Sequence, residues 1–281
     1  MEKQRTLLTF IFIGLIHIAL GQTNCDSLLF GNPIETSMNR WLPQTKNELQ
    51  ITDHKAYTLG YFEEHEQAAW VCYVLSKEEC IGEEERSSSF YVDKQIQTGS
   101  ATNSDYKKSG YDRGHLAPAG DMSYDSITMK ESFYYSNMSP QVPAFNRGIW
   151  KNLETQVREW GLLYGSCIVI TGPILNDSLQ TIGSNQVSVP NWYYKIIVNP
   201  HQTPVQAIGF LIRNESSSAE LNQFVVTIDS IEVISGIDFF AELPLSCEQI
   251  IESRVDGRYW KGFESICISC PISLPSSRKR Q

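Results

Sequence analysis

Basic residues are few in this 281-residue chain, in which 23 Lys and Arg stand against 32 Asp and Glu and the formal net charge is −9. Since Lys and Arg supply most contacts to phosphate groups, this balance taken alone argues against a nucleic-acid-binding protein. The chain also lacks internal repeats and low-complexity linkers, so no pattern marks a boundary between two domains. Hydrophobic residues make up 41% and charged residues 20%, which is typical of a globular protein and too apolar for a disordered one.

A hydrophobic run of the ~20 residues that span a bilayer is missing as well. A shorter apolar run lies at the start of the chain, after Lys3 and Arg5, and it ends in Ala19-Leu20-Gly21. A basic start, a short apolar run and small residues at the exit are typical of a secretory signal peptide. We therefore predict a signal peptide over residues 1–21 and a secreted protein, extracellular or periplasmic, without a membrane anchor.

Cysteine is present in an odd number, so at least one thiol is free or paired between chains. Export to an oxidising compartment permits disulfides among the others. Cys267 and Cys270 have the spacing of zinc ligands and Cys247 lies upstream, but no fourth ligand of the usual spacing accompanies them. A disulfide that ties down the C-terminal tail is therefore favoured, and its pairing stays open. The seven cysteines are Cys25, Cys72, Cys80, Cys167, Cys247, Cys267 and Cys270.

The hydrophobic pattern predicts an α+β fold, because strands cluster around a few helices without regular alternation. Apolar residues at helical spacing predict a helix over residues 146–160, and a short capped helix over 229–234 ends at Gly236. Residues 22–65 are polar and irregular, so we expect them to wrap the surface. Buried strands are expected over residues 68–75, 167–171, 192–198 and 205–212.

One histidine lies in a segment that is rich in glycine and charged residues. In Asp112-Arg113-Gly114-His115 and the residues around it, His115 lies among glycines, an arginine and aspartates, where the loop passes into a strand. Histidine is the side chain best suited to take a proton near neutral pH, although a lone histidine is more often a structural one in a turn. The other histidines form no pair with zinc-ligand spacing, which disfavours a zinc hydrolase.

A second motif lies 22 residues further on, where Ser136-Asn137-Met138-Ser139-Pro140-Gln141 precedes the predicted helix. Asn146 at the helix start and Glu154 eight residues later would lie about 80° apart on one side of that helix. An amide oxygen and a carboxylate are hard ligands of the kind that Mg²⁺ prefers. Each residue also has an ordinary explanation, Asn146 as an N-cap and Glu154 as a solvated surface residue.

Together these motifs resemble those of the DNA/RNA non-specific endonucleases, a family that includes secreted sugar-non-specific nucleases and mitochondrial endonuclease G. The resemblance spans roughly residues 70–243. It implies a single α+β domain over residues 22–281, with a central, mainly antiparallel sheet flanked by helices and a ββα-metal (His-Me finger) site. The core would cover about residues 66–245, and a cysteine-bearing tail over 246–281 has no clear counterpart.

The resemblance implies a role for each central residue. His115 would be the general base that activates water, Asn146 the direct protein ligand of a single Mg²⁺, and Glu154 would hold the ion through water. Mn²⁺ or another divalent cation is left open as a substitute. The ordinary pKa of histidine, ~6.5, leaves the imidazole neutral above neutrality, as a base requires.

Three more residues receive roles in the same way. Asn137 would help to orient the site and the substrate phosphate, and Arg113 would order the site or contact phosphate. Arg86 would also contact phosphate, because it precedes Phe90 by four residues, as an arginine of the family does.

The function implied is a secreted, Mg²⁺-dependent endonuclease that hydrolyses phosphodiester bonds of DNA and RNA with little sequence specificity and leaves 5′-phosphate ends. Two alternatives remain, a phosphodiesterase acting on small nucleotides and an exported nucleic-acid-binding protein with a silent site. DNA and RNA are the expected partners, and the oligomeric state stays open, a dimer included.

The acidic composition is compatible with that function if the positive charge is local. Residues 86–120 hold five basic residues against three acidic ones, and Arg147 and Lys151 add to them from the predicted helix. We therefore expect a confined basic groove on an acidic body, with salt-sensitive and weakly processive binding.

Overall fold

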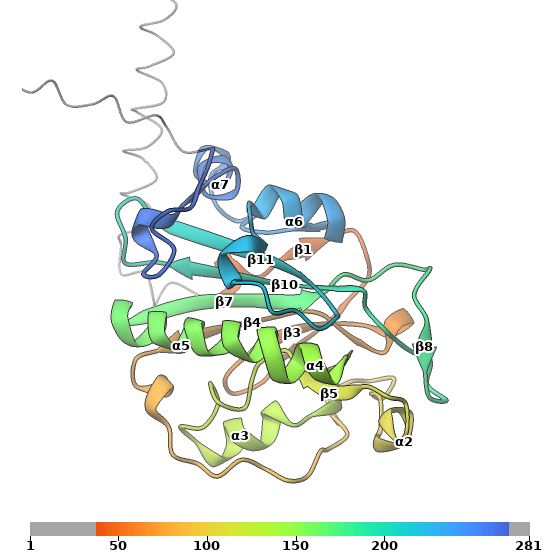
Figure 1. The fold of residues 1–281 in the computed structure, drawn as a ribbon. Coiled ribbons are helices and arrows are strands. Elements are labelled where there is room, and N and C mark those ends of the chain that lie inside the picture. Colours follow the sequence, from red (N-terminus) through yellow and green to blue (C-terminus); the bar gives the residue numbers. More distant parts are fainter. Residues whose placement is uncertain (1–37, 270–281) are drawn as a thin grey trace, which may run out of the picture.

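The computed structural model describes residues 38–269, and its centre is one sheet of seven strands (Figure 1). The strands lie in the order β12-β11-β10-β7-β4-β3-β2, and every neighbouring pair is antiparallel. The predicted α+β class and the mainly antiparallel sheet are confirmed. The strands are β2 (Gln50–Asp53), β3 (Thr58–Phe62), β4 (Gln67–Ser76), β7 (Ser166–Pro173), β10 (Trp192–Asn199), β11 (Gln206–Arg213) and β12 (Val225–Val226).

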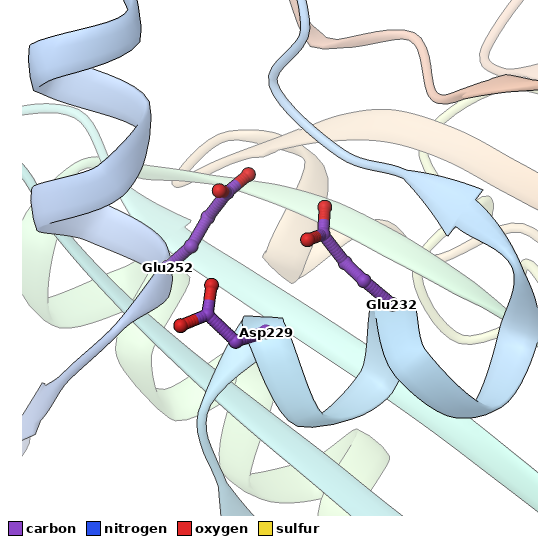
Figure 2. A group of neighbouring side chains, drawn as sticks. All are labelled: Asp229, Glu232 and Glu252. Atoms are coloured by element: carbon purple, nitrogen blue, oxygen red, sulfur yellow. The ribbon is translucent and has the colours of Figure 1, made fainter.

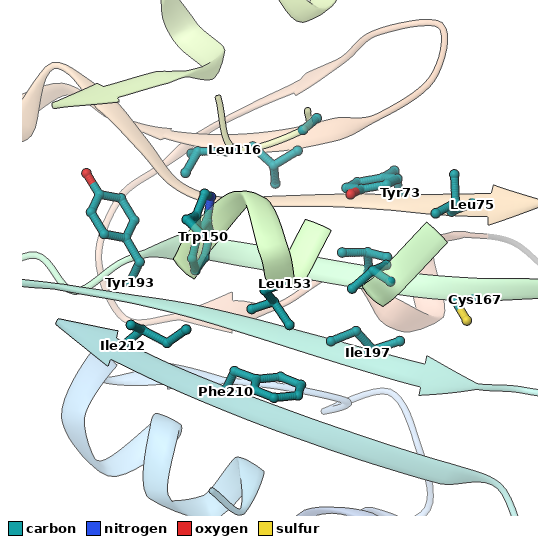
Figure 3. Close-up of a cluster of buried hydrophobic side chains, with 14 of the residues drawn as sticks. Tyr73, Leu75, Leu116, Trp150, Leu153, Cys167, Tyr193, Ile197, Phe210 and Ile212 are labelled. Atoms are coloured by element: carbon teal, nitrogen blue, oxygen red, sulfur yellow. The ribbon is translucent and has the colours of Figure 1, made fainter. Parts of the chain in front are cut away.

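Both faces of the sheet are covered, because successive side chains of each strand point to opposite faces. On one face, residues of β4 such as Tyr73 pack in one cluster with helix α5 (Lys151–Tyr164), as Figure 3 shows for part of this cluster. On the other face, Trp70 packs in a second cluster with helices α6 (Ile228–Ser235) and α7 (Leu245–Glu252). The molecule therefore has three layers, with α5 on one side of the sheet and α6 and α7 on the other (Figure 1).

A two-stranded sheet beside α5 carries both sequence motifs. Strand β5 (Asp112–His115) pairs antiparallel with β6 (Met138–Gln141), and His115 lies opposite Met138. The chain then passes through α4 (Pro143–Phe145) and a single π turn, η5 (Asn146–Trp150), into α5. The strand-strand-helix order expected for the site is thus present.

Short elements complete the fold. Helix α3 (Ser126–Ser132) begins after Asp125, whose carboxylate accepts hydrogen bonds from the backbone N–H groups of the first turn. The remaining elements are η1 (Met38–Trp41), β1 (Gln44–Thr45), η2 (Glu63–His65), η3 (Glu79–Ile81), α2 (Asn103–Tyr106), η4 (Tyr135–Asn137), β8 (Thr181–Ile182), β9 (Val187–Ser188), η6 (Leu221–Phe224), β13 (Ile237–Asp238), β14 (Val255–Asp256), η7 (Gly257–Tyr259) and β15 (Cys267–Ile268).

The four predicted strands correspond to β4, β7, β10 and β11, and the predicted short helix is α6. The Thr227 side chain caps α6, and Gly236 ends it in the left-handed conformation (φ 68°) that glycine adopts without strain.

The expectation that residues 22–65 only wrap the surface is wrong for residues 50–62, which form β2 and β3 of the central sheet. Strand β3 is almost fully buried, but it is only five residues long and a glycine interrupts its strand-forming residues, so the run is too short to stand out from the polar segment around it. The predicted helix over 146–160 is also interrupted. Gly148 has non-helical dihedral angles (φ −106°, ψ −113°) within the π turn that precedes α5.

The C-terminal part is more than a tail, because α7 and residues 255–268 fold back onto the domain. The Trp260 and Phe263 rings contact Trp160 of α5, with ring centroids 4.7 and 5.2 Å apart. The core therefore extends beyond the expected limits of 66–245 at both ends.

The predicted signal peptide lies outside the described residues, as do Cys25 and Cys270. Cys267 and the buried Cys72 and Cys167 are free thiols, as is Cys80. Across residues 38–269, no helix has both the length and the apolar character needed to span a membrane.

Candidate active site

A cavity of about 560 Å³ lies between the end of β5, the η5 turn and α5. Five of the six predicted site residues line it, and only Asn137 does not. Three further basic residues line it from η5 and α5. The lining residues are Arg86, Arg113, His115, Pro118, Ala119, Gly120, Asn146, Arg147, Lys151, Glu154 and Arg158.

His115 ends β5, and its side chain is almost fully buried, with 7% of the residue exposed. Its ring packs edge-on against Phe133, with centroids 4.7 Å apart, and lies 5.9 Å from Phe90. Nε2 has no hydrogen-bond partner among the described residues. Burial, followed by the positive charges of Arg86 and Arg113, lowers the pKa of His115 to about 3. The imidazole is therefore neutral, with a nitrogen available to accept a proton.

Asn146 is oriented by Asp112, a residue of the sequence motif for which no role in the site was predicted. The Asn146 Nδ2 donates to Asp112 Oδ2 at 2.9 Å, which leaves the Oδ1 oxygen as the free acceptor. Arg147 donates to both oxygens of the same carboxylate, at 2.8 and 2.6 Å. Partial burial acts to raise the pKa of Asp112, but the hydrogen bonds from Arg147 and Asn146 outweigh it and hold the pKa below its usual range.

Glu154 lies on the first turn of α5 and faces the same cavity. Within residues 38–269 no hydrogen bond or ion pair engages its carboxylate. Burial raises the pKa of Glu154 above its usual range, and the positive charge of Lys195 opposes this rise. A half-buried carboxylate that faces a cavity and has no hydrogen-bond partner among the described residues is suited to a cation.

The donor set therefore fits a hard divalent cation. Asn146 offers an amide oxygen and Glu154 a carboxylate, both on the same cavity, and Mg²⁺ in proteins takes few protein oxygens and keeps several waters.

Charged side chains from α5 and from the structure beneath it lie close enough to act on the Glu154 carboxyl group, and no sequence pattern predicted them. Arg158 Nη1 donates to Asp121 Oδ1 at 2.8 Å, and the Tyr73 hydroxyl donates to Asp121 Oδ2 at 2.7 Å. Lys195 of β10 is fully buried, and its Nζ lies 4.8 Å from the centroid of the Trp150 ring. Lys195 lies within a strand whose sequence is typical of a buried strand, so only the tertiary packing shows that it is close to Glu154.

Asn137 is not in the cavity, contrary to the expected contact with substrate phosphate. It is fully buried, and its Nδ2 donates to the carbonyls of Ala117 and Ser132 while its Oδ1 accepts from the Ala117 N–H, all at 2.8–2.9 Å. Two hydrogen bonds of this amide hold the backbone of Ala117, just after His115, and the third ties it to the end of α3, which makes Asn137 a positioning residue.

Arg113 joins the main cavity to a second one of about 360 Å³. Its guanidinium stacks on Phe90, 4.1 Å from the ring centroid, and donates to Asn103 Oδ1 at 2.9 Å. Arg86 lies over the Phe133 ring at 5.0 Å, although it is exposed to solvent. The lining of the second cavity combines cations and aromatic rings: Phe90, Asn103, Tyr106, Lys107, Lys108, Tyr111, Asp112, Arg113 and Asn146.

The π turn explains how Asn146 and Glu154 share one cavity without lying on one helix. The expected angle of about 80° assumed a continuous helix, whereas the chain changes direction at Gly148. Single π turns inside helices are frequent at functional sites. Here the turn carries Asn146 toward Asp112 and leaves Glu154 on the regular helix.

A two-stranded antiparallel sheet that carries a neutral histidine and is followed by a helix with candidate metal ligands is the architecture of a ββα-metal nuclease. Comparison with known proteins makes the class specific. The family model described as DNA/RNA non-specific endonuclease matches residues 41–246, and the chain belongs to this family of metal-dependent, phosphodiester-hydrolysing nucleases.

Named relatives agree with this assignment. The chain is 33% identical to mitochondrial Nuclease EXOG of Mus musculus over 235 residues, which is 76% of this chain and 64% of that protein. It is 33% identical to mitochondrial Endonuclease G of Bos taurus, over 68% of this chain and 69% of that one. A nuclease of Nostoc is 32% identical, over 82% of this chain and 85% of its own. The chain thus spans slightly less than two thirds of the mouse protein.

A solved structure is similar as well. The crystal structure of the EndoG/EndoGI complex aligns with a TM-score of 0.68 and 32% identity, covering 75% of this chain and 92% of that chain.

Proposed function

We propose that this protein is a secreted, Mg²⁺-dependent endonuclease that hydrolyses phosphodiester bonds of both DNA and RNA. The observation that carries the proposal is the main cavity, where the neutral imidazole of His115 faces the oxygen donors Asn146 and Glu154. The guanidinium groups of Arg86 and Arg113 add the positive charge that a phosphate requires.

Each residue of the cavity has a separate role in the proposed reaction. His115 accepts a proton from the attacking water, since its neutral imidazole lines the cavity and makes no hydrogen bond to the described residues. Arg86 and Arg113 bind the non-bridging oxygens of the phosphate, and Asp112 holds Asn146 in place through its Nδ2. Asn146 and Glu154 would hold a Mg²⁺, which would supply Lewis-acid stabilisation of the charge on the phosphate and on the leaving oxygen.

The same residues account for the breadth of the proposed substrate. Attack on phosphorus with departure of the 3′ oxygen leaves a 5′-phosphate end and needs no 2′-hydroxyl, so both DNA and RNA fit. The second cavity, lined by Lys107, Lys108 and Tyr111, continues away from the catalytic residues. A polymer would fill it and a small nucleotide would not, which favours an endonuclease over a phosphodiesterase of small nucleotides.

The proposal is tested by comparing substrates under one set of conditions. Supercoiled DNA, single-stranded DNA and RNA are each expected to be cleaved with Mg²⁺ or Mn²⁺ and to survive with EDTA. A chromogenic phosphodiester is expected to react far more slowly than the polymers, because it leaves the second cavity empty. Faster turnover of the small diester would instead favour the phosphodiesterase, and binding without turnover would favour a silent site.

Replacing Lys107 and Lys108 together by alanine is expected to weaken binding of the polymer without changing the rate of the chemical step. We expect KM for DNA to rise about tenfold and kcat to stay within about twofold, because both lysines lie outside the catalytic cavity. The slope of log(kcat/KM) against log[salt] should become shallower by about 1.5, as two phosphate contacts are lost. Lys94→Ala is the matched control, since Lys94 is exposed and lines neither cavity. An unchanged slope in the double variant would contradict this role.

Secretion is part of the proposal. It rests on the basic start and the short apolar run of residues 1–21. Two of the named relatives are mitochondrial proteins, so secretion does not follow from the family. Cys247 is a buried residue of α7, and the proposed tail disulfide joins it to a cysteine other than the four free thiols.

A further inference from the structure

Three carboxylates from α6 and α7 meet on the face of the sheet opposite the active site. Asp229 and Glu232 come from α6 and Glu252 from the last turn of α7, and their side chains point toward a common centre (Figure 2). One oxygen of each lies within 4.8 Å of the others. The proposed nuclease chemistry does not use these residues.

Glu252 sets this cluster apart from an ordinary acidic surface. Only 5% of the residue is exposed, and its Oε1 has no hydrogen-bond partner among the described residues. An unpaired charged oxygen that is removed from water is costly, so it calls for a proton or a cation. Figure 2 shows this carboxylate directed toward Asp229 and Glu232.

The surroundings of Glu252 are acidic throughout. Burial, followed by the neighbouring carboxylates, raises the pKa of Glu252 to about 9. Burial also raises the pKa of Glu232 to about 7. The carboxylates that act on Glu252 are Glu232, Glu248, Asp229 and Asp238. This concentration of negative charge at the end of α7, where the helix dipole is also negative, attracts a cation.

The ligand positions are fixed by the fold. Glu232 Oε1 accepts a hydrogen bond from the backbone N–H of Phe239 at 2.8 Å, which leaves its other oxygen available. Phe239 is fully buried in the cluster between α6, α7 and the sheet. Asp229 lies in the first turn of α6, and Glu252 is held by the packing of α7 on the same cluster.

We propose that Asp229, Glu232 and Glu252 bind a hard divalent cation of the size of Ca²⁺. Oxygens on opposite sides of a bound Ca²⁺ lie about 4.6–5.2 Å apart, so a cluster within 4.8 Å already fits its sphere. Three carboxylates also favour Ca²⁺ over Mg²⁺, because Mg²⁺ in proteins usually keeps several waters and takes only one or two carboxylates. Water completes the coordination on the side of exposed Asp229.

The ion joins α6 to α7, and α7 leads into the segment that carries Trp260 onto α5. We therefore expect Ca²⁺ to raise the melting temperature by about 5–10 °C when its free concentration is about 100 times Kd. The measurement is thermal unfolding of the full chain with Ca²⁺, with Mg²⁺ and with EDTA. It is made in the wild type and in Asn146→Ala, where the proposed catalytic site is impaired, and the Ca²⁺ shift should persist in both.

Glu252→Gln isolates the site. This variant should lose the Ca²⁺ shift, while in EDTA near neutral pH it should unfold close to the wild-type temperature, because the metal-free Glu252 carboxyl, with its pKa raised to about 9, is uncharged like the amide that replaces it. Glu83→Gln, in an exposed acidic loop, is the matched control and should keep the full shift. Calorimetric titration with CaCl₂ should show one site that Glu252→Gln lacks. The proposal is overturned if the wild type does not respond to Ca²⁺, if Glu252→Gln responds as the wild type does, or if Mg²⁺ gives an equal shift in Asn146→Ala.

Discussion

His115→Ala is expected to lower the rate of DNA cleavage by about 10²–10⁴-fold, the usual contribution of a positioned general base. The imidazole packs between Phe90 and Phe133, with its Nε2 free of hydrogen bonds among the described residues, and no other histidine lines the cavity. Kinetics on a short duplex at saturating Mg²⁺ measure the loss, which should fall on kcat because the phosphate contacts of Arg86 and Arg113 remain.

His201→Ala is the matched control, since His201 is exposed and, among the described residues, its ring forms a hydrogen bond with Ser166 alone. It should cleave DNA at close to the wild-type rate. If His115→Ala did so too, His115 would be a structural residue of the hairpin. The low pKa of His115 also means that acid does not inactivate the free enzyme by protonating this base between pH 8 and 5, because the imidazole is neutral above about 3.

Asn146→Ala is expected to weaken Mg²⁺ binding by at least about 10–100-fold and to lower turnover correspondingly at limiting Mg²⁺. The reason is geometric: Asp112 engages the Nδ2 of Asn146, so the oxygen that remains faces the cavity shared with Glu154. Titration calorimetry with Mg²⁺ measures the loss. Asn152→Ala provides the control, because Asn152 is exposed on α5 and lines a different cavity.

The Mg²⁺ affinity measured in the same titration should depend on pH, and the raised pKa of Glu154 determines the direction of that dependence. Because its pKa is raised in the folded protein, part of the carboxyl is protonated below neutrality, and Mg²⁺ must displace that proton. Binding should therefore be weaker at pH 6 than at pH 7.5, with release of a proton into the buffer. Glu154→Gln should bind weakly at both values and release no proton, whereas equal affinity of the wild type at both would contradict the assignment.

The central strands and the two motifs were predictable because each depends on local sequence. Residues of β4, β7 and β10 form apolar runs bounded by turn residues. The motifs also identified His115, Asn146 and Glu154, which line one cavity, although the continuous helix assumed between the last two is broken at Gly148. The resemblance to the family added their roles. It did not reveal that Asn137 holds the backbone after His115 instead of reaching the substrate.

What the sequence did not predict depends on contacts between distant residues. Asp112 lies inside the motif, yet its role depends on hydrogen bonds from Asn146 and Arg147, which lie 34 and 35 residues further along the chain. Lys195 is one charge in an apolar strand, and only the packing of α5 places it near Glu154. An isolated glycine such as Gly148 is common within helices, so the break before α5 had no distinct signal.

The most direct test of the account is plasmid nicking by the wild type, His115→Ala and Asn146→Ala, each with Mg²⁺ and with EDTA, at matched and verified folding. We predict that only the wild type with Mg²⁺ converts supercoiled DNA rapidly to nicked and then linear forms bearing 5′-phosphate ends. Near-wild-type nicking by either variant, or nicking by the wild type that EDTA leaves unchanged, would contradict a metal-dependent reaction centred on His115.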